Sequence, residues 1–140
     1  MAEGCPVKLD VYPAVGAGPT PVLVWIHGGA LISGGRALRG EARTWLRERC
    51  VSAGYTVVSI DYRLAPETKL PAIVEDVQDA FRWVRGAGAD RFNLDPDRIG
   101  VLGHSAGGYL TLMSGYSVEP RPNVLVSFYG YGDLIGEWYS

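Results

Sequence analysis

The strongest constraint on the fold is a continuous apolar run over residues 22–26, which Gly28 and Gly29 follow almost at once. Because the run shows no alternation of apolar and polar residues, it predicts a strand buried on both faces. Residues 56–61 and 99–103 have the same character. Segments with helical spacing of apolar residues separate these runs. Buried strands that alternate with helices predict an α/β fold, a parallel sheet sandwiched by helices.

The remaining elements follow from the same periodicities. Residues 7–12 alternate and predict an extra antiparallel edge strand. Three of the four tryptophans follow the core periodicity and are expected to be buried: Trp25, Trp45 and Trp83. A turn is expected at Asp95-Pro96-Asp97. Helices are predicted over residues 41–53, 71–85 and 106–115, and a fourth strand over residues 124–129.

Composition excludes several classes of protein. With 47% hydrophobic and 20% charged residues, the 140-residue chain is globular and of single-domain size. Thirteen basic against fifteen acidic residues give no electrostatic case for nucleic acid. No apolar stretch is long enough for a membrane span, and no signal peptide is recognised, so a cytoplasmic location is expected. Five arginines interrupted by two glutamates predict a solvated helix face: Arg36, Arg39, Arg43, Arg47 and Arg49, with Glu41 and Glu48.

Cysteine and histidine usage points to neither a disulfide scaffold nor a metal centre. Cys5 and Cys50 are read as free thiols, with Cys50 on the buried side of a helix. The two histidines lie far apart in the sequence and make no recognisable metal site with the cysteines. A metal centre is therefore not expected.

The sequence Gly-His-Ser-Ala-Gly-Gly at residues 103–108 has the spacing of a nucleophile elbow. In such a turn a serine is lifted above the sheet between a strand and a helix, and small residues flank it because the backbone is crowded. Ser105 is the candidate nucleophile, at a helix N-terminus that favours a developing oxyanion. A glycine-rich turn without catalytic function is the alternative.

A second unusual strand end is His-Gly-Gly-Ala at residues 27–30. Acyl transfer needs backbone N–H donors aimed at the tetrahedral oxyanion, and Gly28 and Gly29 are suited to present them. The N–H group of Ala106 would complete this oxyanion hole. Taken alone, the glycine pair is more typical of a tight turn, but the two motifs on separate strands of one sheet favour the catalytic interpretation.

From residue 21 onward the chain resembles the hormone-sensitive-lipase-like branch of the α/β-hydrolase superfamily, which contains carboxylesterases and lipases. The resemblance lies in residues 27–30, 61–67, 71–83, 95–99 and 103–108. It implies that Ser105 is the nucleophile, that Gly28, Gly29 and Ala106 form the oxyanion hole, and that the substrate is a small-molecule ester. It also implies that no cofactor takes part.

Two positions depart from the family pattern. Ala30 stands where the family usually has a third glycine, so the hole survives if this position needs no positive φ. His104 stands where many members have an acidic residue. A histidine at this position occurs in related enzymes, namely feruloyl and acetyl-xylan esterases and kynurenine formamidases, which leaves the substrate class open. Arg63 and Glu67 are expected to brace the neighbouring loop, and His27 to hydrogen-bond loop backbone, with a base role as the less favoured alternative.

The largest departure is that no histidine follows Ser105, although the elbow serine needs a histidine base and an acid. The fold is therefore expected to be an α/β-hydrolase fold lacking its last two strands. Residues 1–20 would be an N-terminal edge segment and residues 21–140 the first half of the catalytic core. Asp133 is either a turn former, the favoured interpretation, or a candidate acid.

The preferred interpretation is an incomplete serine carboxylesterase that lacks its base, and a truncated, non-catalytic product or a binding module with the same half-fold is the alternative. A partner chain that supplies the acid and base is a third. An apolar strand at residues 124–129 on the sheet edge also predicts homo-oligomers or aggregation through that edge.

Overall fold

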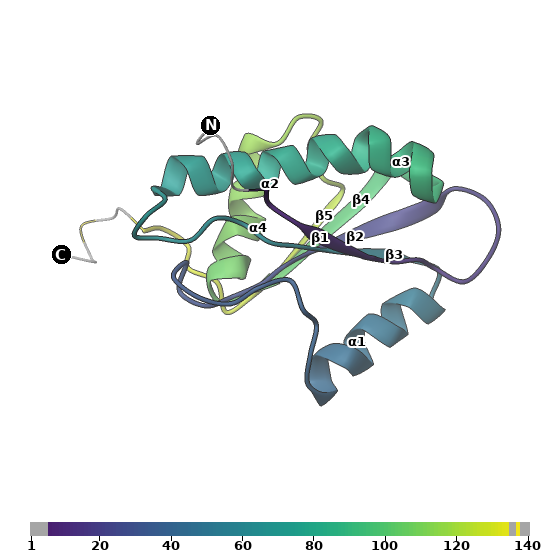
Figure 1. Cartoon of the computed structure of the whole chain (residues 1–140), viewed down its shortest axis with the longest axis horizontal. Coiled ribbons are helices and arrows are strands. Elements are labelled where there is room, and N and C mark those ends of the chain that lie inside the picture. The colour runs from purple at the N-terminus through teal and green to yellow at the C-terminus, as the bar shows by residue number, and fades with distance from the viewer. Residues whose placement is uncertain (1–5, 135–136, 138–140) are drawn as a thin grey trace.

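The structure, a computed structural model, describes residues 6–134 and residue 137. Its strands form one five-stranded sheet in the order β1-β3-β2-β4-β5 (Figure 1). Cys5 lies outside the described residues. The elements are β1 (Leu9–Tyr12), β2 (Thr20–Ile26), α1 (Glu41–Ser52), β3 (Thr56–Ile60), α2 (Leu70–Arg85), α3 (Ala87–Phe92), β4 (Leu94–His104), α4 (Ala106–Ser117) and β5 (Val124–Phe128).

Strand β2 lies in the centre of the sheet, parallel to β3 on one side and to β4 on the other. Val24 is paired with Val58 and with Val101 in the two neighbours. Strand β1 pairs antiparallel with β3, which confirms the predicted edge strand. Because the chain leaves β2 toward β3 and later returns to β4, the carboxyl ends of β2 and β4 meet at a topological switch point.

Apolar residues alternate between the two faces of the sheet and define two cores of different size. The face covered by α2, α3 and α4 contains the larger core, built on Val24, Val58 and Val101. The other face is covered by α1 and has a small core of Trp25, Leu38, Val57 and Leu102. Figure 1 shows α1 alone below the strands, with α2 and α3 above them. The predicted sheet between helices is confirmed.

Helix α2 illustrates how the sequence specifies these elements. Pro71 stands in its first turn, where a missing N–H group costs nothing, and Gly86 follows its last residue. Its buried positions recur at helical spacing and face the larger core: Ile73, Asp76, Val77, Ala80, Phe81 and Val84.

Three details differ from the sequence prediction. Trp45 is 62% exposed, because α1 has no helix beside it among the described residues and only its Leu46 side packs on the sheet. The expected turn at residues 95–97 lies inside the first part of β4, where the pairing with β2 shifts register. The short helix α3 was not predicted, since its glycines and single turn carry no periodic signal.

Strand β5 is the weakly covered part of the sheet. Among the described residues it pairs with β4 alone, and Val124 and Phe128 are 57% and 44% exposed.

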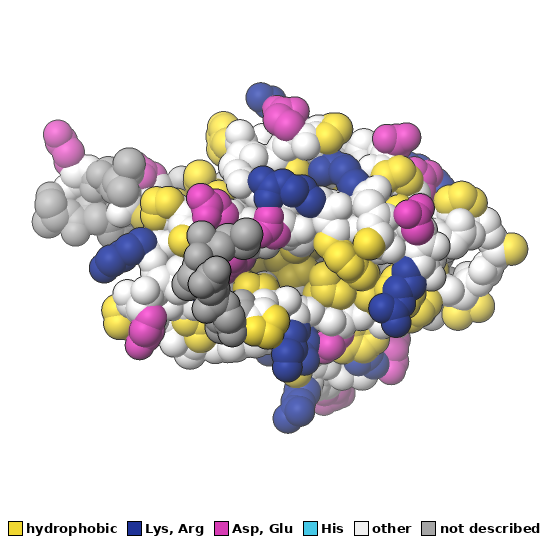
Figure 2. Space-filling model, turned by 45° about the horizontal axis from the view of Figure 1, so that its top comes forward, with side chains coloured by type: hydrophobic (Ala, Val, Ile, Leu, Met, Phe, Trp, Pro, Cys, Tyr) yellow, Lys and Arg dark blue, Asp and Glu magenta, His cyan; other side chains and the backbone are white. Residues whose placement is uncertain are grey.

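Acidic and basic side chains are interspersed over the face drawn in Figure 2, with apolar side chains between them. None of the helices that the described residues form has the length and apolar character needed to cross a bilayer.

Candidate active site

Ser105 occupies a sharp turn between β4 and α4, which we call the serine turn (residues 103–108). Its φ of 55° and ψ of −124° lie in a strained region for a non-glycine residue, and it stands directly before the first helical residue, Ala106. The Ser105 N–H donates to the Phe128 carbonyl at 2.9 Å. The side chain is half-buried at the carboxyl end of β4. This geometry agrees with the predicted strand–turn–helix placement of the serine.

The glycines of the serine turn are required by close backbone packing. A Cβ on Gly103 would overlap the carbonyl oxygen of Gly107, and a Cβ on Gly107 would overlap the carbonyl oxygen of Ile26. A Cβ on Gly108 would lie 2.8 Å from the Cα of Gly130. The turn is therefore wedged between the ends of β2 and β5.

The segment after β2, here called the glycine loop (residues 27–36), lies directly against the serine. A Cβ on Gly28 would be 2.8 Å from the His104 carbonyl oxygen and 3.3 Å from the Ser105 Cβ. Gly29 has a φ of 123° and turns the chain back so tightly that a Cβ there would overlap Ser33. The structure thus brings Gly28 beside Ser105, as the two motifs predict.

Three consecutive carbonyl groups of the glycine loop accept hydrogen bonds. The His27 carbonyl accepts from the Tyr62 hydroxyl at 2.9 Å, and the Gly28 carbonyl lies 2.7 Å from the His27 Nδ1. The Gly29 carbonyl accepts from the backbone N–H groups of Ile32 and Ser33, each at 3.0 Å. The backbone of the loop is therefore fixed at each of its first three peptide groups.

Ala30 does need a positive φ, at 55°, and Leu31 follows with 65°. From the sequence, the oxyanion hole is expected to survive the alanine if this position needs no positive φ. The structure does not meet that condition. A side chain in the left-handed region costs about 1 kcal/mol. Ala30 keeps its backbone N–H, and the loop adopts its conformation at that cost.

Arg36 fastens the far end of the glycine loop to the sheet. Its backbone N–H donates to the Asp61 carboxylate at 2.7 Å, and its guanidinium donates to Asp61 and Asp10 at 2.6 and 2.8 Å. Arg36 was predicted on a solvated helix face together with the arginines of α1. That prediction is wrong, because Arg36 precedes α1 and pairs with carboxylates of β1 and of the segment after β3.

Arg63 holds the segment after β3 in place, whereas Glu67 has no hydrogen bond or ion pair to the described residues. The Arg63 guanidinium donates to both oxygens of the buried Asp76 in α2 at 2.8 to 3.0 Å, and to the Ala72 carbonyl at 3.2 Å. Glu67 is exposed. The bracing expected of both residues is therefore observed for Arg63 alone.

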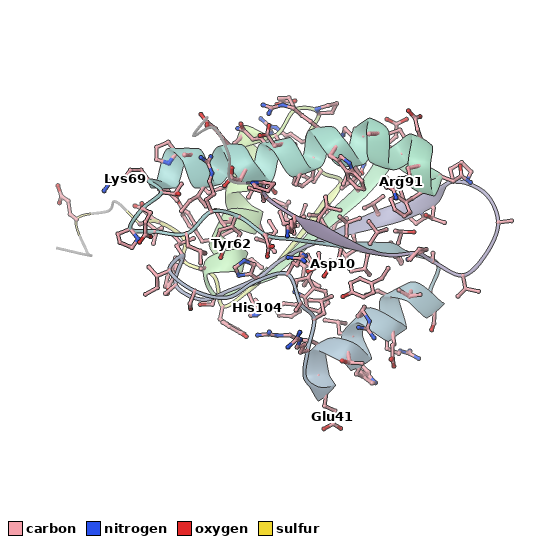
Figure 3. All side chains as sticks on the ribbon, viewed as in Figure 1. Asp10, Glu41, Tyr62, Lys69, Arg91 and His104 are labelled. Atoms are coloured by element: carbon pink, nitrogen blue, oxygen red, sulfur yellow. The ribbon has the colours of Figure 1, made fainter. Side chains whose placement is uncertain are left out.

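The two histidines lie in different surroundings. The His27 ring is buried and stacked on Tyr62 at 4.2 Å, and burial lowers its pKa. The half-buried His104 ring (labelled in Figure 3) lies 3.3 Å from the guanidinium of Arg43 in α1, and its pKa is lowered first by burial and then by the Arg43 charge. Within the described part of the chain, neither histidine hydrogen-bonds the Ser105 hydroxyl.

Asp133 lies in the segment after β5, near the Tyr109 hydroxyl. Burial raises the pKa of Tyr109, and the nearby Asp133 carboxylate raises it further. Both interpretations of Asp133, turn former and acid, stay predictions. The described residues contain no cluster of three or more His, Cys, Asp and Glu side chains that would bind a metal ion.

Sequence reasoning missed the contributions of Tyr62 and Arg36 to this site. Tyr62 had a usable signal, since it lies two residues after the end of the buried strand β3 and so at the same sheet edge as His27. Arg36 had none, because its partners Asp10 and Asp61 are distant in sequence and join it through the fold.

The serine turn, the adjoining glycine loop and the order of the strands define an α/β-hydrolase fold of the hormone-sensitive-lipase-like type. Residues 9–133 match the BD-FAE family, and the chain belongs to that family. The solved esterase Est2 of Thermogutta terrifontis with propionate bound superimposes with a TM-score of 0.78 at 25% identity, over 92% of this chain and 52% of that one.

Two curated relatives have similar sequences. The esterase LipC of Mycobacterium tuberculosis is 41% identical over 101 residues, which are 72% of this chain and 24% of LipC. The arylacetamide deacetylase of Oryctolagus cuniculus is 38% identical over 105 residues, which are 74% of this chain and 26% of that protein. The chain spans about a quarter of the length of these relatives.

Proposed function

We propose that this chain carries the nucleophile and the oxyanion hole of a serine carboxylic-ester hydrolase. The observation that supports it most directly is the contact between the glycine loop and the serine turn, with the Gly28 Cβ position 3.3 Å from the Ser105 Cβ. Relatives named as an esterase and a deacetylase, and a solved esterase of the same fold, support the same chemistry.

In the proposed reaction the Ser105 hydroxyl oxygen attacks the ester carbonyl carbon while its proton passes to a base. The N–H groups of Gly28, Gly29 and Ala106 stabilise the oxyanion. The bond to the alcohol oxygen then breaks, and the base returns the proton to the leaving alcohol. Water, deprotonated by the same base, attacks the acyl carbon, the bond between this carbon and the Ser105 Oγ breaks, and the base returns the proton to Ser105 as the carboxylic acid leaves.

The base of this scheme lies outside the described residues. The Nδ1 of His27 contacts the Gly28 carbonyl, and its ring stacks on Tyr62. The Nε2 of His104 contacts Arg43, so neither of these nitrogens is directed at the Ser105 hydroxyl. Since the chain spans about half of the matching solved esterase, we propose that sequence beyond Ser140, or a partner chain, supplies the histidine and its acid.

The test compares three preparations in hydrolysis of p-nitrophenyl acetate. The first is the 140-residue chain, the second is the protein made from the reading frame continued past the codon for Ser140, and the third is a matched pair of Ser105→Ala variants, one of each protein. We expect turnover by the longer protein that Ser105→Ala lowers by at least about 10³-fold, and activity near background for the chain alone.

Two results would contradict parts of the proposal. Turnover by the longer protein that survives Ser105→Ala overturns Ser105 as the nucleophile. Normal turnover by the 140-residue chain that Ser105→Ala abolishes keeps the nucleophile but overturns the external base. A stop codon directly after Ser140, together with no activity on mixing with candidate partner chains, would contradict the whole proposal. The alternative would then be a truncated, non-catalytic product or a binding module.

We also propose that the isolated chain pairs with a second copy through the open edge of β5. Val124, Val126 and Phe128 stand on the face that α1 covers only in part, and all are exposed by at least 37%. Size-exclusion chromatography with light scattering tests this: dimers or larger species are expected, and fewer of them in Val126→Lys. A sharp monomer peak for the unchanged chain would overturn it.

A further inference from the structure

Two of the three proposed oxyanion donors, the Gly28 and Gly29 N–H groups, belong to peptide groups whose carbonyl oxygens are in contact with a buried side chain. In a trans peptide the C=O bond of one residue and the N–H bond of the next point in opposite directions. A hydrogen bond that fixes the His27 carbonyl therefore also fixes the direction of the Gly28 N–H. In the same way, a hydrogen bond to the Gly28 carbonyl fixes the Gly29 N–H.

The groups that hold these carbonyls are the two stacked side chains of Tyr62 and His27. The Tyr62 hydroxyl donates to the His27 carbonyl at 2.9 Å, and the His27 Nδ1 contacts the Gly28 carbonyl at 2.7 Å. Their rings stack at 4.2 Å with an interplanar angle of 8°. Both side chains are buried, at 4% exposure each, so water does not compete for these bonds.

The carbonyl of His27 also limits where the serine turn can lie. A Cβ on Gly107 would come within 2.6 Å of the His27 carbonyl oxygen, so this oxygen is packed between the Tyr62 hydroxyl and the start of α4. The same peptide group thus sets both the Gly28 N–H and its position relative to Ser105. Figure 3 shows Tyr62 at the end of the sheet where this junction lies.

We propose that Tyr62 and His27 are positioning residues that orient the Gly28 and Gly29 N–H groups toward the oxyanion on Ser105. The Tyr62 hydroxyl orients the first donor, and the His27 ring, with its proton on Nδ1, orients the second. This inference rests on the proposed ester hydrolysis for its catalytic meaning, but the orientation itself is a property of the 140-residue chain.

Tyr62 is itself held in place by its neighbour. Arg63 ties the segment to α2 through Asp76, with its backbone N–H donating to that carboxylate at 2.9 Å. The phenol is therefore presented from a fixed backbone. Burial raises the pKa of Tyr62 well above its usual range, so the hydroxyl keeps the proton that it donates.

The sequence allows a direct observation of the first donor. His27-Gly28 is the one His–Gly pair among the 140 residues. Protein with carbonyl-¹³C histidine and ¹⁵N glycine therefore gives a single cross-peak in an HNCO spectrum, that of the Gly28 N–H. We expect one sharp peak for the unchanged chain and a shifted, broadened peak for Tyr62→Phe, which keeps the ring stack and loses the hydroxyl.

The matched control is Tyr12→Phe. Tyr12 is a half-buried tyrosine of β1 whose ring lies under the Arg47 guanidinium, 4.8 Å away, on the α1 side of the sheet. Its substitution removes a hydroxyl at a distance from the loop and should leave the Gly28 peak in place. A Gly28 peak unchanged in Tyr62→Phe overturns the proposal, whatever happens to the melting temperature.

A second arm uses ester hydrolysis by the active form. Loosening a donor acts in the transition state, so Tyr62→Phe should lower kcat about tenfold and leave KM within about twofold. His27→Asn, which keeps a donor near the Nδ1 position, should retain more kcat than His27→Leu. Equal kcat for Tyr62→Phe and the unchanged enzyme overturns the catalytic part of the proposal.

The two arms also separate this inference from the proposed function. Turnover that survives Ser105→Ala contradicts the proposed function, while the Gly28 peak still reports whether Tyr62 orients the loop. A shifted Gly28 peak with normal kcat restricts Tyr62 to a structural role and so contradicts its role as a positioning residue.

Discussion

The serine turn and the glycine loop lie in contact, yet they are held by different forces. The serine turn is fixed by backbone packing, with Gly103 and Gly107 so close to other backbone that a Cβ has no room. The glycine loop is fixed by hydrogen bonds of polar side chains, above all those of Tyr62, which follows β3, and of the loop's own Arg36. Steric packing leaves no room for a larger residue at these glycines. A loop held by several hydrogen bonds instead loses its orientation gradually, as one bond after another is removed.

The largest expected effect is in the serine turn. Gly107→Ala drives a methyl group into the Ile26 carbonyl, and we expect a loss of about 3 kcal/mol or more in the free energy of unfolding. Urea denaturation measures it. Gly132→Ala is the matched control, because a Cβ there meets nothing within 4 Å. Similar losses for both variants would contradict steric fixation of the turn.

A substitution in the buried ion pair of Arg63 and Asp76, which supports the segment that carries Tyr62, should lower the unfolding free energy nearly as much. Asp76→Ala leaves the Arg63 guanidinium without its main partner, and we expect a loss of about 3 kcal/mol in unfolding free energy. The comparison variant is Asp79→Ala, one turn further along α2, whose pair with Arg82 is exposed. That substitution should cost less than about 1 kcal/mol. Equal losses would show that burial of the pair is irrelevant.

Acid should weaken the glycine loop more than the serine turn. Burial lowers the pKa of both His27 and His104, so below the ordinary value of 6.5 the unfolded chain binds more protons than the folded one. Stability is then lost as the pH falls through 6.5 toward the lowered pKa values.

Urea denaturation at about pH 7.5 and about pH 5.5 measures this loss. Because His27 is the more deeply buried, His27→Asn should reduce the pH dependence more than His104→Asn. The reverse order would contradict the assignment of the acid sensitivity to the glycine loop.

The smallest effect is expected at Ala30. Ala30→Gly relieves the strain of a φ of 55° but gives the unfolded chain more freedom, so we expect a net gain of less than about 1 kcal/mol. Ala37→Gly, in the segment that follows the loop, has no positive φ to relieve and should be destabilising by a similar amount. A loss of stability in Ala30→Gly would show that the left-handed conformation carries no strain.

The same difference explains what could be predicted from the sequence. The strands, α2 and the serine turn follow from apolar periodicity and from glycines at fixed spacing, which are local signals. The polar support is not local: Arg36 meets Asp10 and Asp61 only once the sheet has formed. The prediction that Trp45 is buried is wrong for a related reason. Helical periodicity indicates which residues share one side of α1, but it cannot tell whether another element covers that side.

The strand order has a consequence for synthesis on the ribosome. The central strand, β2, leaves the ribosome early, but Val24 pairs with Val58 in β3 and with Val101 in β4, which is made much later. Until β4 emerges, an apolar strand stands with one edge open, and contacts so distant in sequence form slowly. We expect nascent chains that end within α2 to be the species most prone to aggregate and to need a chaperone.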